Sequence, residues 1–504
     1  MKLARLCAAA GLDCGHDATR DVVAADATVT GFAIDHRKVA PGTVFGAFEG
    51  ARVNGEHFIA DAVKAGAVAV VARPEAKVAG AQHITSAEPR RTFAQLAARF
   101  FVPVPEHIVA VTGTNGKTST VEMTRQIWRM AGERAASIGT LGVTTPDESV
   151  STGLTTPDIV TFLSNMSGLA REGVTHVAYE ASSHGLSQFR NEGVPVEAVA
   201  FTNFSRDHLD YHADMDEYFA AKMRLFDEVA SDDARAVVWV GSGESEWTQR
   251  ALDHAQRRGL ALMTLGEAGA DIRLLDRSAS QLGQSLTIEH GGTARSITLP
   301  LIGAYQVATA LTAAGLALAS GIDPALVWDA VARLQPVRGR LERAVITPQG
   351  APVYVDYAHT PDAIEAAIVA LRPHVKGRLI TVFGAGGDRD HGKRGPMGEV
   401  ASRASDVVIV TDDNPRGEEA GEIRRQVMAG TGANAHEVAG RRAAIAEAVA
   451  MAGRDDIVLI AGKGHERGQI VGSGENERVL PFDDVEVARE CAAAANDGNW
   501  GNDT

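Results

Sequence analysis

Residues 107–120 join an apolar strand to a glycine-bracketed turn and a lysine–threonine pair that opens a helix. Gly113 and Gly116 let the backbone come close to a polyphosphate, and the amides at the start of the helix point towards an anion. Lys117 supplies a positive charge, and Thr118 offers a hydroxyl to Mg²⁺. The pattern therefore predicts a loop that binds nucleotide phosphates.

The spacing of this loop departs from the usual form, because the position five residues before Gly116 is Val111 rather than glycine. A plain glycine turn between a strand and a helix is the alternative interpretation. The Gly-Lys-Thr triplet directly follows a convincing strand, which favours nucleotide binding. We take nucleotide binding as the working hypothesis.

Potential metal ligands are concentrated in residues 202–212, and Glu180 ends a neighbouring predicted strand. Carboxylate and hydroxyl oxygens suit Mg²⁺ and one imidazole is tolerable, whereas the lack of cysteines argues against structural zinc. A polar loop with a hydrogen-bonded histidine is the simpler explanation for His208 taken alone. Beside a phosphate loop, a hard-cation site is the favoured interpretation.

Lys222 lies in an amphipathic helical stretch, residues 218–226. Long cationic side chains on such helices usually face water. On spacing alone we therefore predict an exposed surface lysine at this position.

The strands expected to position these side chains are residues 174–180 and 198–203, which read as buried parallel strands. Ligands of open α/β sheets lie beyond the carboxyl ends of the strands. We therefore expect Glu180 and Asn203 to face the same crevice as the phosphate loop. Residues 235–300 carry alternating stretches and are predicted to form an antiparallel flap.

The chain is expected to form three α/β domains with boundaries at 1–105, 106–335 and 336–504. In the first, residues 58–67 read as a helix and 68–72 as a strand, and Pro103 and Pro105 suit a linker. In the third, three predicted strands each run into a charged loop, at 384–390, 412–416 and 462–466. One such loop alone is usually only solvated, but three at corresponding strand ends favour a ligand site.

The bulk composition is that of a globular protein of 504 residues, with 45% hydrophobic residues, 22% charged residues and a net charge of −15. This charge argues against a general nucleic-acid or acidic-membrane surface. The three cysteines form no ladder of spacings, so we predict a reducing, cytoplasmic setting and no structural disulfide. Residues 1–13 read as a short amphipathic helix, and no stretch approaches the roughly 20 apolar residues that span a bilayer.

Five motifs, taken together and in order, resemble the Mur ligases of peptidoglycan synthesis, and the short phosphate loop matches that family's own form. They are Gly-Thr-Asn-Gly-Lys-Thr-Ser at 113–119, Glu-Ala-Ser-Ser-His at 180–184, residues 203–212, Asp-Tyr-Ala-His-Thr-Pro at 356–361 and Gly-Lys-Gly-His-Glu at 462–466. The resemblance covers nearly the whole chain. It implies an α/β fold of three domains: an N-terminal UDP-binding domain, a central P-loop ATPase domain with a parallel sheet, and a Rossmann-like C-terminal domain that binds an amino acid.

The resemblance also implies a reaction, that of the family members that add diaminopimelate. ATP phosphorylates the D-glutamyl side-chain carboxylate of UDP-MurNAc-L-Ala-D-Glu, the amine of meso-2,6-diaminopimelate attacks the acyl phosphate, and ADP and phosphate leave. The cofactor implied is Mg²⁺, with ATP as co-substrate. We expect a monomer whose partners are these small molecules, without nucleic acid or membrane.

Site residues are transferred from the family position by position. The metal-site and catalytic residues implied are Lys117, Thr118, Glu180, His208 and Lys222, with Lys222 carbamylated to N6-carboxylysine. The ATP contacts implied are Gly113, Thr114, Asn115, Gly116, Lys117, Thr118, Ser119, Arg340 and Asp356. For the UDP-MurNAc-dipeptide, the contacts implied to the muramyl-dipeptide portion are Thr155, Thr156, Ser182, Gln188 and Arg190. Those implied to the UDP end are Asp35, Arg37 and Asn115.

The predicted diaminopimelate contacts are Arg389, Asp413, Asn414, Arg416, Gly462 and Glu466. A guanidinium such as that of Arg416 matches a carboxylate two bonds at a time, and diaminopimelate has a second carboxylate where lysine has only an ammonium group. The alternative is that Arg416 forms a surface ion pair with Glu418 or Glu419.

Two departures from the family pattern concern nucleotide contacts. His36 replaces the usual serine of an Asp-Ser-Arg triplet, and Gln306 and Thr309 stand in a segment usually written with two asparagines.

Other hypotheses for the chain are an L-lysine-adding Mur ligase, a folylpolyglutamate synthetase and a non-enzymatic nucleotide-binding scaffold. The 105 residues before the phosphate loop argue against a folylpolyglutamate synthetase, which would not need a separate UDP-binding domain there. The complete set of Lys117, Glu180, His208 and Lys222 argues against a scaffold without enzymatic activity.

Overall fold

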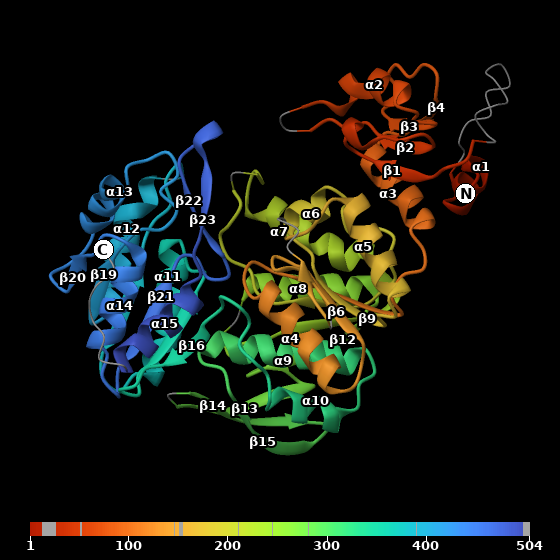
Figure 1. Cartoon of the computed structure of the whole chain (residues 1–504). Coiled ribbons are helices and arrows are strands. Elements are labelled where there is room, and N and C mark those ends of the chain that lie inside the picture. Colours follow the sequence, from red (N-terminus) through yellow and green to blue (C-terminus); the bar gives the residue numbers. More distant parts are fainter. Residues whose placement is uncertain are drawn as a thin grey trace. The chain divides into compact units, whose positions relative to one another are not determined.

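The computed structural model describes residues 1–12, 27–50, 53–145, 147–150, 155–209, 211–243, 245–280, 282–389 and 391–496 (Figure 1). The chain divides into two compact units, Met1–Asp271 with Thr312–Val327, and Ile272–Leu311 with Trp328–Thr504. Both units alternate helices with mainly parallel strands, which confirms the predicted α/β class.

The first unit begins with a four-stranded parallel sheet in the order β1-β2-β3-β4. Its elements are α1 (Leu3–Ala9), β1 (Gly31–Ala33), β2 (Thr43–Gly46), α2 (Ile59–Lys64), β3 (Ala69–Ala72), β4 (Gln82–Thr85) and α3 (Pro89–Phe100). Helix α3 starts on a proline, which suits the first helical position, and it buries Phe93 and Leu96 on one face. The Phe93 ring packs edge-on against Phe32 and Phe48 of the sheet layer.

A larger sheet of the first unit carries the phosphate loop. Strands β12-β11-β10-β5-β9-β6 are parallel in that order, and β7 and β8 extend the β6 edge antiparallel. The elements are β5 (His107–Thr112), α4 (Lys117–Met130), β6 (Ala135–Gly139), β7 (Gly142–Thr144), β8 (Ser149–Val150), α5 (Ile159–Arg171), β9 (His176–Glu180), α6 (Ser183–Ser187), β10 (Val196–Phe201), α7 (Met215–Arg224), β11 (Ala230–Trp239), α8 (Glu246–Arg258) and β12 (Ala261–Gly266).

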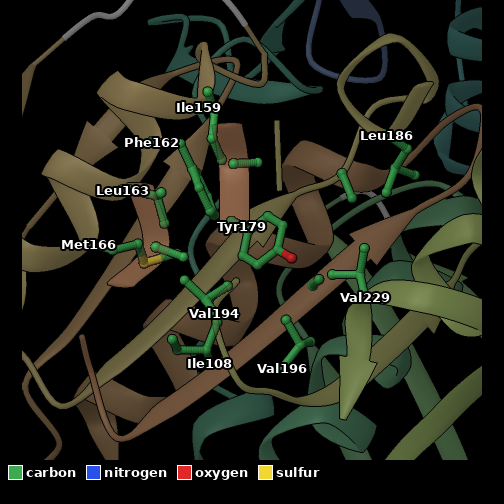
Figure 2. Close-up of a cluster of buried hydrophobic side chains, with 14 of the residues drawn as sticks. Ile108, Ile159, Phe162, Leu163, Met166, Tyr179, Leu186, Val194, Val196 and Val229 are labelled. Carbon is green, nitrogen blue, oxygen red and sulfur yellow. The ribbon is translucent and has the colours of Figure 1, made fainter. Parts of the chain in front are cut away.

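The core of this sheet surrounds Tyr179, as Figure 2 shows. The ring of Tyr179 on β9 meets that of Phe162 on α5 edge-on, with centroids 5.1 Å apart. Ile108 of β5 and Val196 of β10 belong to the same buried cluster. Strands buried on both faces read as continuous apolar runs, which explains why β5, β9 and β10 were recognisable in the sequence. Polar residues follow only at the strand ends.

The second unit contains a six-stranded sheet in the order β16-β17-β21-β18-β19-β20, parallel except for the β16 edge. Its elements are β16 (Glu342–Ile346), β17 (Pro352–Asp356), α11 (Pro361–Leu371), β18 (Leu379–Phe383), α12 (Arg394–Ala404), β19 (Val407–Val410), α13 (Ala420–Met428), β20 (Ala435–Glu437), α14 (Arg441–Met451), β21 (Ile457–Ala461), β22 (Gly468–Val471), β23 (Arg478–Pro481) and α15 (Asp484–Asn496). The unit also holds the antiparallel strands β13 (Ile272–Ser280), β14 (Gly283–His290) and β15 (Thr293–Leu299). The remaining helices are α9 (Ala304–Ala319) and α10 (Pro324–Val331).

The predicted flap is wrong in its first part. Residues 235–266 form two parallel strands, β11 and β12, joined by helix α8. Ser245 caps the start of α8 with its side chain, and Gly259, at φ +77°, ends the helix. The alternation that suggested a flap belongs to β14, so a pattern from one strand was extended too far along the chain.

Two expectations about the chain's setting have different outcomes. Among the described residues, none of the helices is long and apolar enough to cross a membrane. The prediction of no disulfide is wrong at Cys7, which is disulfide-bonded, whereas the buried Cys491 is free. Cys14 lies outside the described residues. Spacing could not reveal this bond, because it depends on how the chain folds back.

A buried ion pair fixes the strand ends of the second unit. Arg441 and Asp484 are fully buried and joined by two hydrogen bonds of 2.7 Å. Arg441 also donates to the carbonyls of Asp412 and Ala461, which follow and end β19 and β21. We expect Asp484→Ala to lower the free energy of unfolding by about 3–5 kcal/mol, because it leaves a buried charge without its partner. Equilibrium urea unfolding measures the loss.

The pair Arg442 and Glu490 is the matched control, because it joins the same two helices at the surface. Glu490→Ala should change the free energy of unfolding by no more than about 1 kcal/mol. Equal losses in the two variants would contradict the importance assigned to the buried pair.

Candidate functional site

The phosphate loop lies between β5 and α4, as predicted. Gly116 caps α4 in the left-handed region, at φ +85°, and Gly113 has φ +140°. A Cβ atom added at Gly113 would lie 2.0 Å from Oγ1 of Thr202, at the end of β10. Glycine at 113 is therefore required both by the backbone angle and by the close approach of the neighbouring strand end.

Lys117 turns back over this loop. Its Nζ donates to the carbonyl oxygens of Gly113 at 2.8 Å and Thr114 at 2.7 Å. Thr118 and Ser119 are buried in the first turn of α4, where free backbone amides are available to an anion. The loop thus combines the ammonium group of Lys117 with a helix N-terminus, a combination that binds phosphate.

The end of β10 holds the loop from the other side. Asn203 accepts from the amide of Asn115 at 2.9 Å and donates to its carbonyl at 3.1 Å. Thr202 donates to the same carbonyl at 2.6 Å. The expectation that Asn203 faces the phosphate loop is confirmed. The backbone of Asn115 is fixed by these bonds, which leaves its side chain to meet a ligand.

Glu180 at the end of β9 meets Thr118. The Thr118 hydroxyl donates to Oε2 of Glu180 at 3.0 Å, and Glu180 is buried. The amide of Thr140 donates to Oε1 at 2.7 Å, and the Thr140 hydroxyl donates to Oε2 at 3.2 Å. A Cβ atom at Gly139 would lie 2.1 Å from Oε1, so glycine there makes room for the carboxylate. Sequence reasoning placed Glu180 correctly and missed Thr140.

A hard cation fits the oxygen pair of Thr118 and Glu180. Within the described ranges, no group of three His, Cys, Asp or Glu side chains is arranged to hold a metal ion. Mg²⁺ commonly binds through one or two protein groups, with water and substrate phosphate completing its shell. The donor set therefore suits Mg²⁺ shared with a nucleotide better than a closed protein site.

His208 lies in the loop after β10 with its side chain partly exposed. Its backbone has φ +53°, and its Nε2 lies 3.4 Å from Oδ2 of Asp207. Its ring stands edge-on to that of His184, with centroids 4.9 Å apart. Asp210, in the same cluster, lies outside the described residues. A role for His208 at the metal stays a prediction.

Lys222 is not the exposed lysine that its helical spacing predicted. It is 1% exposed, and its Nζ donates to the carbonyl of Gly113 at 2.7 Å. The same Nζ lies 4.4 Å from the centroid of the Tyr218 ring. Burial, together with the charge of Lys117, holds the pKa of Lys222 well below its usual value. Helix α7 thus delivers its lysine into the phosphate loop.

The five residues expected to contact the muramyl-dipeptide lie together. Thr156 donates to the carbonyl of Glu180 at 2.9 Å, and Ser182 donates to the Thr156 hydroxyl at 3.0 Å. Arg190 donates to the carbonyl of Thr156 at 3.0 Å and to Gln188 at 2.7 Å. Thr155 joins the set through a 3.0 Å hydrogen bond between its hydroxyl and that of Thr140. This cluster connects directly to the proposed metal-binding carboxylate.

The residues assigned to the UDP end make local contacts. Asp35 caps a short 3₁₀ turn and accepts two side-chain hydrogen bonds from Arg37 at 2.8–2.9 Å. The Arg37 guanidinium lowers the pKa of Asp35 to about 2. The ring of His36 stacks on that of Phe58, with centroids 4.3 Å apart. A flat ring therefore stands where the family usually has serine, and contacts to a uridine stay a prediction.

In the second unit, Arg340 and Asp356 lie close in the fold. Asp356 ends β17 and accepts hydrogen bonds from the amides of Leu341 at 2.8 Å and Ala358 at 2.9 Å. Burial raises the pKa of its carboxyl. The Arg340 guanidinium lies over the Tyr357 ring at 4.9 Å, and Gln306 donates to the Arg340 carbonyl at 3.1 Å. Gln306 thus keeps polar contact with this region although it departs from the family pattern.

The loops after β19 and β21 lock together. Asn414 donates to Oε2 of Glu466 at 2.9 Å. The fully buried Lys463 donates to Oδ1 of Asn414 at 2.8 Å and lies 3.2 Å from Oε2 of Glu466. Among the described residues, the buried Oδ2 of Asp413 has no hydrogen-bond partner, and Nη1 of Arg441 lies 3.8 Å away. A Cβ atom at Gly462 would lie 2.6 Å from this oxygen. Four of the predicted amino-acid contacts therefore belong to one cluster, with Lys463 as a member that sequence reasoning missed.

Arg416 reaches the loop after β18. Its Nη1 donates to the carbonyl of Gly387 at 3.0 Å, and its backbone has φ +51°. Arg389, in the same loop, has an exposed guanidinium contact with the carbonyl of Asp388. The alternative of an ion pair with Glu418 is wrong, because the buried Arg394 holds Glu418 through two hydrogen bonds of 2.9 Å. In these contacts the guanidinium of Arg416 meets a backbone carbonyl and not a carboxylate.

Comparisons with known proteins agree with this geometry. Three family models match consecutive parts of the chain: "Mur ligase family, catalytic domain" at 28–106, "Mur ligase middle domain" at 111–317, and "Mur ligase, glutamate ligase domain" at 339–464.

Two curated relatives carry the name UDP-N-acetylmuramoyl-L-alanyl-D-glutamate–2,6-diaminopimelate ligase. The protein of Zymomonas mobilis is 57% identical over 92% of this chain and 95% of its own length. The protein of Bradyrhizobium diazoefficiens is 48% identical over 95% of this chain and 98% of its own length. A solved structure of the same name superposes with a TM-score of 0.74 at 31% identity, covering 98% of this chain and 99% of the other. The chain belongs to the Mur ligase family.

Proposed function

We propose that this protein is an ATP-dependent ligase that adds meso-2,6-diaminopimelate to the D-glutamyl side-chain carboxylate of UDP-MurNAc-L-Ala-D-Glu in peptidoglycan precursor synthesis. Its relatives of 45–57% identity bear the name of that ligase. The observation that carries the proposal is the bond between Thr118 of the phosphate loop and Glu180, from which the polar cluster of Thr155, Thr156 and Arg190 extends. A phosphoryl donor and a carboxylate acceptor can thus be held side by side.

The chemistry accounts for the need for ATP. A carboxylate repels a nucleophile and its oxide is a poor leaving group, whereas an acyl phosphate accepts an amine and releases phosphate. Transfer of the γ-phosphoryl group between two anions requires positive charge where they meet. Lys117 and the amides at the start of α4 supply that charge in this chain.

We assign Thr118 and Glu180 as the residues that hold Mg²⁺, with His208 and Lys222 as further ligands. When bound, the ion neutralises charge on the nucleotide phosphates and on the phosphoryl group in transfer. The amide and the hydroxyl of Thr140 donate hydrogen bonds to Glu180 and so orient its carboxylate for this task.

We propose that Lys222 is carbamylated, as its position in the family implies, and its surroundings support the proposal. Lys117 and Lys222 both donate to the carbonyl of Gly113, so two ammonium groups would share one buried oxygen. The lowered pKa favours the neutral amine of Lys222, which is the form that attacks CO₂. The amine gains the carboxyl group and releases a proton, and the product is an anion beside Lys117. The change replaces a repulsion with an attraction.

We further propose the domain boundaries 1–105, 106–335 and 336–504, a cytoplasmic location and a monomeric enzyme. The first domain binds the UDP end through Asp35 and Arg37, the second binds ATP and the muramyl-dipeptide, and the third binds the amino acid. The family models support these boundaries, because the first ends at 106, the second covers 111–317 and the third begins at 339.

A coupled assay tests the function. With ATP, Mg²⁺ and meso-diaminopimelate, ADP release should depend on UDP-MurNAc-L-Ala-D-Glu, and removal of Mg²⁺ by a chelator should abolish it. Accumulation of the tripeptide product is measured by mass spectrometry. ADP release that is independent of the dipeptide substrate would contradict the proposal and favour a nucleotide-binding scaffold.

The amino acid is expected to be meso-diaminopimelate rather than L-lysine. Arg416 can bind the second carboxylate of diaminopimelate and repel the ammonium group of lysine. Arg416→Ala should therefore lose about 2–5 kcal/mol of discrimination between the two. The ratio of kcat/KM for the two amino acids measures it.

Arg425 provides a control for Arg416, because it is an exposed arginine on the neighbouring helix α13. Arg425→Ala should keep the preference for diaminopimelate. Equal efficiency of the unaltered enzyme with lysine would overturn the choice of amino acid and leave the ligase proposal in place.

A further inference from the structure

Arg90 stands in the first turn of helix α3, half-buried, and none of the site assignments above includes it. Its guanidinium lies over the ring of Phe48, 4.9 Å from the centroid, and donates to the carbonyl of Glu49 at 3.0 Å. Both partners are uncharged groups. Over the described part of the chain, Arg90 therefore has no carboxylate in its hydrogen bonds or ion pairs.

Helix α3 packs against the segment that carries Arg190. The guanidinium of Arg91 lies 5.7 Å from the centroid of the Phe189 ring, and a Cβ atom at Gly193 would lie 2.1 Å from the Cβ of Ala98. Burial lowers the pKa of Arg90, and the neighbouring charge of Arg190 lowers it further. Arg90 and Arg190 therefore lie within electrostatic range of each other, one on each side of the contact between α3 and the dipeptide cluster.

Among the described residues, Arg190 likewise has no carboxylate in its hydrogen bonds or ion pairs, although the charge of Asp158 acts on it from nearby. Its hydrogen bonds go to the carbonyl of Thr156 and the amide oxygen of Gln188. The nearby Asp158 accepts from the amides of Val160 and Thr161 instead. Burial lowers the pKa of Arg190. Two half-buried guanidinium groups that repel each other are an arrangement that an anion would stabilise.

Arg91, the next residue along the helix, shows the opposite pattern. It pairs with Glu228 at 3.0 Å and approaches Glu88 at 3.7 Å. In the described part of the chain, the same turn of α3 therefore holds Arg91, which is paired with carboxylates, and Arg90, which is paired with none. Both arginines pack on the same turn of α3, so their place on the helix does not explain why Arg91 meets carboxylates while Arg90 meets an aromatic ring and a carbonyl.

We propose that Arg90 and Arg190 form an anion subsite for the muramyl substrate, binding a phosphate or carboxylate group of UDP-MurNAc-L-Ala-D-Glu. The inference rests on the proposed function. It adds Arg90, on α3, to the residues that recognise this substrate, and it joins the part of the chain assigned to the UDP end to the dipeptide cluster. The substrate offers two such groups, the diphosphate and the D-glutamyl α-carboxylate.

The test uses Arg90→Met, which keeps a long apolar side chain beside Phe48 and removes the charge. We expect KM for the UDP-linked substrate to rise about 10- to 100-fold, the range for losing a hydrogen bond to a charged group. KM for ATP and for the amino acid should stay unchanged. Arg90→Lys should recover part of the loss, and Arg91→Met, the matched control, should leave all three KM values near those of the unaltered enzyme.

Competition with fragments identifies the anion. If Arg90→Met weakens inhibition by UDP alone, the subsite holds the diphosphate; if it weakens inhibition by MurNAc-L-Ala-D-Glu alone, the subsite holds the carboxylate. Either result supports the inference. An unchanged KM for the UDP-linked substrate in Arg90→Met, in an enzyme that otherwise turns over, would overturn the subsite and leave the proposed function standing. Absence of turnover in the unaltered enzyme would instead reject the proposed function.

Discussion

Lys117→Ala is expected to lower the rate of ligation by on the order of 10²- to 10⁴-fold, as when one electrostatic contact to a transition state is removed. The ammonium group of Lys117 lies on the phosphate loop, where it donates to the carbonyls of Gly113 and Thr114. The transferred phosphoryl group approaches a carboxylate, so loss of this charge acts on kcat more than on the KM for ATP. Single-turnover measurements of ADP formation separate the two effects.

Arg129→Ala is the control for this variant, because Arg129 is an exposed cation in the last turn of the same helix, α4. It should turn over at nearly the normal rate. Thermal unfolding of Lys117→Ala shows whether the loop still folds without its lysine. A folded Lys117→Ala variant with near-normal turnover would remove the phosphate-loop assignment.

Lys222→Ala is expected to be nearly inactive and to regain part of its activity with a short carboxylic acid such as acetate or propionate. The reason is that the proposed carbamate supplies oxygen ligands that alanine lacks and that a free carboxylate can replace. The buried position of Lys222 beside Gly113 leaves space for such a small anion once the side chain is removed. Turnover is measured against acid concentration.

Lys117→Ala serves as the control for rescue, because its deficit is a missing cation and carboxylates should not restore it. Incorporation of labelled bicarbonate into the unaltered enzyme, followed by NMR, observes the carbamate directly. Full activity of Lys222→Ala without added acid, together with absence of the labelled carbamate, would contradict the modification.

The sequence was sufficient for the strands and for the residues at their ends. The apolar runs of β5, β9, β10, β18, β19 and β21 are buried on both faces, so hydrophobicity alone marks them. Because parallel strands place their carboxyl ends on one edge, Glu180 and Asn203 could be assigned to the crevice of the phosphate loop. Periodicity failed at β11 and β12, where the alternation of a later strand was extended to a parallel region.

Tertiary structure alone decided the environment of each charge. Helical spacing predicted an exposed Lys222, yet α7 packs so that its ammonium reaches Gly113, 109 positions away along the chain. Arg416 and Glu418 are near neighbours in sequence, but Arg394 of another helix holds Glu418 and leaves Arg416 to the loop after β18. Arg90 and Arg91 have the same side chain, and among the described residues the packing of α3 gives a carboxylate partner to Arg91 but not to Arg90. The pKa of a side chain and its availability to a ligand depend on neighbours brought together by folding, and residue spacing does not contain that information.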